Sequence, residues 1–150
     1  MTVAPPRTPE QRKTDTLARF ERDIDAWVAS ADAAGNAYLI PLSFIWDGTA
    51  FTLATGETSL TTRNLTRAGR VRLAFGPTRD VVIVDGTVRT YSRETVPDAV
   101  AEAFAARHWD ARASRTRYTF FVVTPRRILA WREENELDGR ELMRDGRWLA

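Results

Sequence analysis

Cysteine is absent from this chain of 150 residues, and His108 is its only histidine. The lack of thiols excludes disulfides, thiolate chemistry and cysteine-ligated zinc sites. A single imidazole leaves few options for a histidine-based metal site or a Ser-His-Asp triad. The sequence also has no phosphate loop, no GxGxxG turn after a strand and no nucleophile elbow. We therefore assign no catalytic side chain and no metal ligand.

Long apolar runs are missing as well, and no segment approaches the length needed to cross a bilayer. The first 22 residues carry both charge signs and do not fit a signal peptide, so a soluble cytoplasmic protein is expected. Lys13 is the only lysine, and arginine sets the pI near 9.5. The net charge is only +2 because acids are interspersed. Neither nucleic acid nor a membrane is therefore an expected partner.

The length and the hydrophobic share of 43 % suit one globular domain over residues 1–150. Residues 1–7 are predicted to be a flexible tail. Thr8 is a predicted N-cap, followed by proline at the first helical position. The buried stripe of that helix is expected at helical spacing, over Leu17, Phe20 and Ile24.

After this helix the pattern changes to strands. Six strand regions are predicted from short apolar, aromatic and β-branched runs that turn residues separate: 26–31, 36–46, 50–55, 71–75, 80–92 and a last region of two segments, 118–124 and 128–131, with a bend at Pro125. Gly86 inside the fifth region predicts a bulge or sharp bend. A closed or half-closed antiparallel barrel is the economical architecture, because closure removes exposed edges. Three tryptophans are expected in its core: Trp27, Trp46 and Trp131.

Two short helices interrupt the strands. Thr58 or Ser59 caps the first, which should turn Leu60 and Leu65 inward and end at Gly69. The second is predicted from Pro97 to about Arg107. Residues 137–150 are predicted to be a tail that packs on the barrel or on a partner, with three apolar anchors: Leu142, Met143 and Trp148.

The segment from Thr55 to Asn64 is the candidate for ligand binding. A strand ends there in small and hydroxyl residues, and a helix N-terminus favours anions through its free N–H groups. Ser59 and Thr61 can donate hydrogen bonds, and Arg63 can hold a phosphate bidentately. The alternative is a simple helix cap with a solvated Arg63, and local chemistry alone favours that alternative.

A resemblance to a known family favours the ligand-binding interpretation of this segment over the simple helix cap. The stretch from Trp27 to Arg93 resembles the pyridoxamine-5′-phosphate-oxidase-like, FMN-binding split-barrel superfamily, and most clearly its actinobacterial members that use the deazaflavin coenzyme F420. The short sequence motifs that match, in order and in spacing, are 41–48 (PLSFIWDG), 53–55 (LAT), Ser59, 63–65 (RNL), 70–73 (RVRL) and 84–88 (VDGTV). The resemblance implies a mainly β, α+β fold, a six-stranded antiparallel split β-barrel with short flanking helices.

The resemblance also implies a homodimer that holds FMN or F420 between its protomers. Pro41, Leu42 and Ser43 would border the ring system. The residues expected near the phosphate are Thr55, Ser59, Thr61, Arg63 and Asn64, and Trp131 is a further candidate because the last strand approaches the groove. Many members have a basic residue where this chain has Thr61. Arg79 or Arg126 would then have to compensate, or cofactor affinity is low.

The function implied is a flavin- or deazaflavin-dependent oxidoreductase that acts on a small-molecule substrate, with the cofactor carrying the hydride. A non-catalytic protein that binds or sequesters the cofactor is the main alternative, and Thr61 favours it slightly. A small basic barrel that binds nucleic acid would need aromatics exposed beside arginines. True pyridoxamine-phosphate oxidation is disfavoured, because its substrate-phosphate residues are not recognisable in this chain.

Overall fold

The computed structural model describes residues 2–150, so Met1, in the predicted tail, lies outside the described residues. The first helix, α1 (Pro9–Arg22), begins where the sequence predicts: the Thr8 hydroxyl oxygen accepts a hydrogen bond from the Gln11 N–H at 3.1 Å. Its buried face comprises three residues at four-residue spacing, Arg12, Thr16 and Phe20. The expectation for Ile24 is wrong: the helix ends before it, and Ile24 is 58 % exposed.

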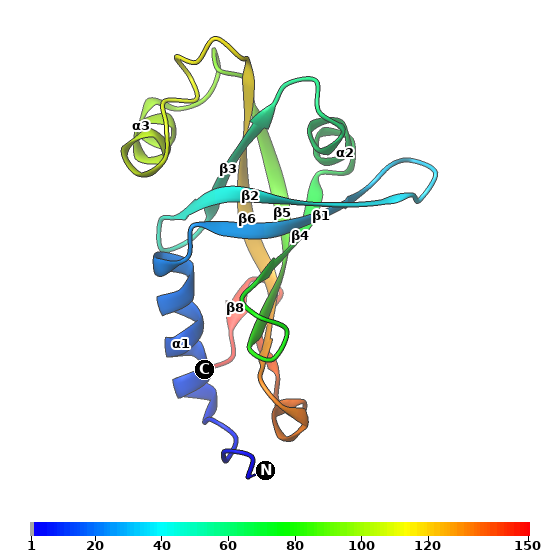
Figure 1. Ribbon diagram of the computed structural model, residues 1–150, viewed down its shortest axis with the longest axis vertical. Coiled ribbons are helices and arrows are strands. Elements are labelled where there is room, and N and C mark those ends of the chain that lie inside the picture. Colours follow the sequence, from blue (N-terminus) through cyan, green and yellow to red (C-terminus); the bar gives the residue numbers. More distant parts are fainter. Residues whose placement is uncertain (1) are drawn as a thin grey trace.

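Six antiparallel strands form the barrel (Figure 1). They are β1 (Asp25–Ala31), β2 (Ala37–Trp46), β3 (Phe51–Gly56), β4 (Arg70–Phe75), β5 (Val81–Tyr91) and β6 (Tyr118–Trp131). The neighbours follow the order β3-β2-β1-β4-β5-β6, and pairing of β3 with β6 closes the ring. The predicted six-stranded barrel is thus confirmed. Its interior holds an aromatic cluster in which Phe20 of α1 packs against Phe51 and Phe75 with ring centroids 4.7 and 5.0 Å apart.

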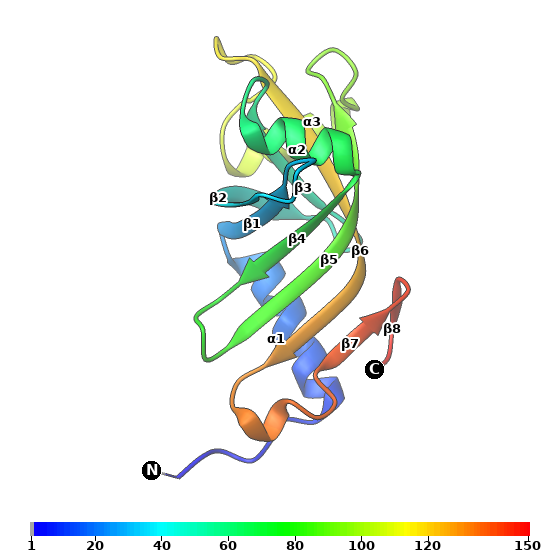
Figure 2. The same cartoon turned by 90° about the vertical axis from the view of Figure 1, so that its right-hand side faces the viewer.

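The two predicted short helices cap and flank the barrel. The N-cap of α2 (Leu60–Ala68) is Ser59, and its C-cap is Gly69 in the left-handed conformation at φ 66°. Figure 2 shows α2 lying across one end of the barrel. The other helix, α3 (Asp98–Arg107), packs on the outside, where Phe104 joins a second apolar cluster with Ile45 of β2 and Phe120 of β6.

The bulge predicted at Gly86 is confirmed. Asp85 pairs with Arg127 and Gly86 pairs with Pro125, so Arg126 is the extra residue on β6. A Cβ on Gly86 would lie 2.6 Å from Val123 Cγ1, which explains the glycine. Because the bulge falls beside Pro125, β6 accommodates a residue without an N–H and runs as one continuous strand rather than two.

The C-terminal segment extends the sheet. After η1 (Glu134–Glu136), β7 (Glu141–Arg144) pairs with β6, and β8 (Arg147–Trp148) pairs with β7. Leu142 and Met143 are buried in the core, and Trp148 packs against it. β7 pairs with the C-terminal part of β6, beyond the part that pairs with β3.

The three strand tryptophans differ in burial. Trp46 packs against the core. Trp27 is 49 % exposed, so its predicted core position is wrong. The neighbours Ala26 and Val28 point inward, and alternation along β1 therefore turns Trp27 outward. Trp131 is half-buried near the end of β6, under the guanidinium of Arg140.

An ion cluster fastens α1 to the segment between β6 and β7. Glu136 is 2 % exposed and accepts hydrogen bonds from Arg7 Nη2 at 2.7 Å and from the Arg132 N–H at 2.8 Å. Arg12, 3 % exposed, donates to four carbonyl oxygens, those of Arg7, Ala130, Glu136 and Gly139. Arg7, the last residue of the predicted tail, is therefore tied to the body of the protein.

Candidate functional site

The first half of β2 has a free edge. Residues 37–43 pair with β1, but only residues 44–46 pair with β3. Within residues 2–150 no strand pairs with the other edge of 37–43. The barrel is thus split beside Pro41, Leu42 and Ser43, the residues expected to border the cofactor ring.

The backbone groups on that free edge can be identified from the ladder. The Phe44 N–H donates to the Ile24 oxygen, and the Asp32 N–H donates to the Asn36 oxygen, across the same β1–β2 register. Hydrogen-bonded pairs alternate in an antiparallel ladder, so the even-numbered residues of β2 bond to β1. The backbone groups of residues 39, 41 and 43 therefore point into the split. Residue 41 is proline and lacks an N–H, which reduces the risk of pairing with another chain.

The N-terminus of α2 comes shortly after β3, the strand on the other side of this split. The Ser59 hydroxyl oxygen accepts from the Thr62 N–H at 3.1 Å, and the Arg63 N–H bonds back to the Ser59 oxygen at 3.2 Å. In the described residues no acceptor is recorded for the N–H groups of Leu60 and Thr61. Thr61 is 0 % exposed, so its amide is closed to a ligand, whereas the amide of Leu60, together with the positive end of the helix dipole, suits an anionic group.

The charged side chains beside this helix terminus come from three segments. Arg63 is exposed and forms no ion pair within residues 2–150. Arg117 lies between Glu57 at 2.8 Å and Glu94 at 2.7 Å. Hydrogen bonds to Glu57 and then to Glu94 raise the pKa of Arg117, and the Arg117 hydrogen bond lowers the pKa of Glu94. Arg63 is therefore the cation left available to a ligand.

Arg117 is a residue of this site that sequence reasoning did not identify. The Glu57 N–H donates to the Arg117 oxygen at 2.9 Å, so backbone and side chain both hold the loop that enters α2. The only local signal was an acid in each segment, at Glu57 and Glu94. Glu57 and Glu94 come close to each other because β3 and β5 both pair with β6.

Thr61 and Asn64 lie on the buried face of α2. Asn64 is 3 % exposed and donates to the Ser30 hydroxyl at 3.1 Å. Thr61 is 0 % exposed, and its hydroxyl oxygen has no hydrogen-bond partner. Thr55, 9 % exposed, sits at the same end of the barrel. Thr61 and Asn64 are thus on the buried side of α2, whereas Ser59 and Arg63 lie nearer its surface.

Three other candidates lie away from this helix terminus. Trp131 is twelve residues along β6 from Thr119, the partner of Thr55, which is at most about 40 Å of strand. Arg79 is held by Glu133 at 2.8 Å near the end of β5 that pairs with Trp131. Arg126 is the bulge residue beside Gly146. Neither arginine replaces a basic residue at position 61.

Comparison with known proteins places these features in a family context. The family model described as pyridoxamine 5′-phosphate oxidase matches residues 14–132. No curated protein sequence matches the chain. Among solved structures, an F420 reductase is similar at 17 % identity and TM-score 0.58, covering 74 % of this chain and 93 % of that one.

Two further structures have the same fold at low identity. HutZ, the haem storage protein of Vibrio cholerae, is 12 % identical with TM-score 0.65, over 79 % of this chain and 94 % of that one. A Clostridium acetobutylicum protein related to general stress protein 26, of the pyridoxinephosphate oxidase family, is 16 % identical with TM-score 0.61, over 83 % and 90 % of the two chains. At these identities the likeness shows the fold alone.

Proposed function

Because the chain belongs to the pyridoxamine 5′-phosphate oxidase family, we propose that it is a flavin- or deazaflavin-dependent oxidoreductase. The observation that carries the proposal is the split between β2 and β3, because β3 leads directly into the N-terminus of α2. Bound FMN or F420 would supply the electron or hydride transfer. The protein would orient the ring and hold the phosphate, so no catalytic side chain is required.

The residues beside the split and at the start of α2 fit FMN or F420 in part. The free backbone groups of Leu39 and Ser43 can hydrogen-bond the polar edge of a planar ring. The Leu60 N–H can hold a phosphate together with the guanidinium of Arg63, which forms no ion pair within residues 2–150. The Thr61 side chain contributes nothing, because its hydroxyl is buried.

A homodimer is part of the proposal. Trp27 and Leu39 lie on the outer face of the β1–β2 pair and are 49 % and 58 % exposed. Large apolar side chains that share an exposed face suit an interface between copies of the chain. We expect sedimentation equilibrium to give a dimer, and Trp27→Glu to shift it to the monomer with unchanged circular dichroism. A monomeric parent protein would contradict this part of the proposal.

Haem storage, the role of HutZ, is the rival that a structural neighbour suggests. Haem iron in proteins is commonly held by His, Cys, Met or Tyr. The single histidine, His108, has its Nε2 2.7 Å from the Phe44 oxygen, where it is already engaged. Absence of a Soret shift on haem titration would agree with the oxidoreductase proposal.

Fluorescence titration with FMN and with F420 tests the proposal directly. Micromolar binding of either cofactor supports it, and the tighter cofactor identifies the chemistry to screen. Oxidation of the reduced cofactor by small-molecule acceptors then separates an enzyme from a protein that only sequesters the cofactor. If neither cofactor binds at micromolar concentration, the proposal fails.

A further inference from the structure

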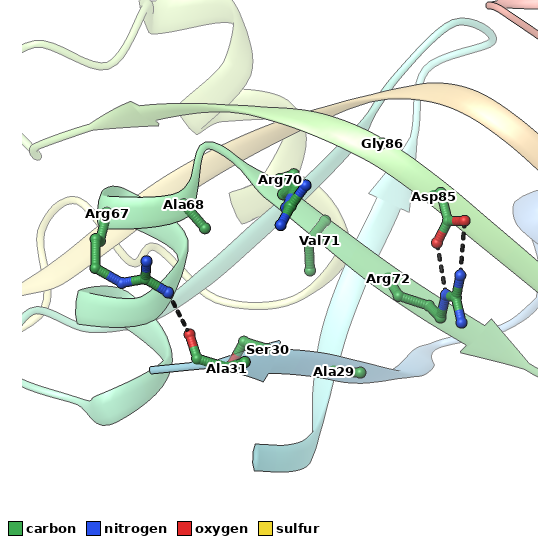
Figure 3. A pocket seen from close by; sticks show the side chains of 10 residues that line it. All are labelled: Ala29, Ser30, Ala31, Arg67, Ala68, Arg70, Val71, Arg72, Asp85 and Gly86. Carbon is green, nitrogen blue, oxygen red and sulfur yellow. Dashed lines mark hydrogen bonds and ion pairs between the residues drawn. The ribbon is translucent and has the colours of Figure 1, made fainter. Parts of the chain in front are cut away.

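A hollow of about 530 Å³ opens on the outer face of the barrel, beside the C-terminal end of α2 (Figure 3). Its floor consists largely of small apolar residues, and its rim carries three arginines and one acid. The lining comprises Ala29, Ser30, Ala31, Arg67, Ala68, Arg70, Val71, Arg72, Asp85 and Gly86. The volume lies within the range of small-molecule sites.

Local structure explains why these side chains converge. Arg67 occupies the last turn of α2, and Gly69 turns the chain directly into β4. Arg70 and Arg72 alternate with the inward-facing Val71 and Leu73, so both project outward. The hollow is separated from the N-terminus of α2 by the nine-residue helix, about 13 Å long.

The charges around the hollow are not balanced. Arg72 is neutralised by Asp85 through two hydrogen bonds of 2.6 and 2.9 Å. Arg67 donates only to the neutral Ala31 oxygen at 2.7 Å, and Arg70 forms no ion pair in the described part of the chain. Figure 3 shows these two guanidiniums on the side of the hollow away from the Arg72–Asp85 pair. After the hydrogen bonds from Asn36, the charge of Arg67 also contributes to the lowered pKa of the Asp32 carboxyl, so Arg67 lies close to an acid. Arg70 is therefore the arginine of the hollow that has no acidic partner within residues 2–150.

We propose that this hollow binds a small organic anion. An apolar body would lie against Ala29, Ala31 and Ala68, while a carboxylate or phosphate would be held by Arg70 and Arg67. Burial of the apolar body and charge-assisted hydrogen bonds would act together. The proposal does not depend on a redox cofactor, because no residue of the hollow belongs to the proposed cofactor site. Ala29 pairs with Leu39, so the hollow borders the face proposed for the homodimer, and the site would lie beside that interface.

Isothermal calorimetry with 2-naphthoate, without FMN or F420, tests the site on the full chain. We expect binding that weakens as salt is added and is at least about tenfold weaker for neutral 2-naphthamide. Arg70→Gln should weaken 2-naphthoate binding about tenfold. The matched variant Arg115→Gln removes an exposed arginine far from the hollow and should leave the affinity unchanged. A parallel titration with 2-naphthyl phosphate identifies the preferred anion.

A second variant reverses the sign of the effect. Asp85→Asn frees the charge of Arg72 and should tighten 2-naphthoate binding about threefold. Circular dichroism checks that each variant is folded. Absence of 2-naphthoate binding to the parent protein would overturn the proposal. So would an Arg70→Gln affinity equal to that of Arg115→Gln, or weaker binding by folded Asp85→Asn.

Discussion

Two arginines at the α1 end of the barrel and two at the α2 end lie in opposite environments. At the α1 end, the Arg7 side chain is 9 % exposed and held by Glu136, and Arg12 is enclosed by carbonyl oxygens. At the α2 end, Arg63 and Arg70 are exposed and have no ion-pair partner within residues 2–150. Buried, paired arginines fasten segments together, whereas exposed, unpaired arginines remain available for an anion.

The largest expected effect lies at the α1 end. The Arg7 hydrogen bond lowers the pKa of Glu136 from 4.5 to about 2. Its stabilising contribution is therefore present above about pH 4.5 and is lost as the pH falls toward 2. We expect Glu136→Gln to lower the free energy of unfolding at pH 7 by about 3 kcal/mol, measured by urea denaturation. The difference from the parent protein should disappear near pH 2.

Glu133→Gln is the matched control for this prediction. Glu133 is in the same segment but pairs with Arg79, whose side chain is 78 % exposed. Exposed ion pairs contribute less than about 1 kcal/mol. Equal effects of the two variants would show that the α1 cluster does not stabilise the fold more than a surface pair.

An intermediate effect is expected at Thr61. Thr61→Lys introduces the basic residue typical of the family, but position 61 is buried beneath α2 and in its first turn. An unpaired ammonium there should destabilise the fold by about 2 kcal/mol. Thr61→Val at the same position removes a hydroxyl without a partner and should change stability by less than about 1 kcal/mol. A stable Thr61→Lys variant with tighter FMN binding would instead place position 61 at the phosphate.

The smallest expected effect on stability is at Arg63. Arg63→Gln should change the free energy of unfolding by less than about 0.5 kcal/mol, because the side chain is exposed. The same substitution should weaken binding of FMN or F420 about tenfold in a fluorescence titration. Arg147→Gln removes the same charge from an exposed position on β8 and should leave cofactor affinity unchanged. Equal affinities of the two variants would remove α2 from the cofactor site.

Local signals predicted much of the fold. The caps at Thr8, Ser59 and Gly69 place two helices to within a residue or two, because capping depends on neighbours in the chain. Gly86 correctly marked the bulge. Trp27 was misjudged because its face depends on which side of β1 meets the core, and an apolar side chain alone does not decide that.

The candidate site was predicted in outline. Family resemblance drew attention to the β2 strand and the start of α2, and these flank the split in the barrel. The resemblance could not show that Arg63 is exposed and Thr61 is buried, since both fall on one short helix. Helix periodicity describes faces, but only packing shows which face is inside.

The sequence by itself indicated the three helices, the six barrel strands, their antiparallel pairing and the family, because these follow from turns, caps, alternation and the spacing of short motifs. It did not indicate β7 and β8, which lie in the segment predicted to be a tail. Only the tertiary structure decided which arginines are paired. Arg7 and Glu136 are 129 residues apart, and the residues of the α2 hollow come from one helix and three strands. Such contacts depend on closure of the barrel and on the bulge at Gly86. Both bring together residues that are far apart in the chain, so neither leaves a pattern in the local sequence.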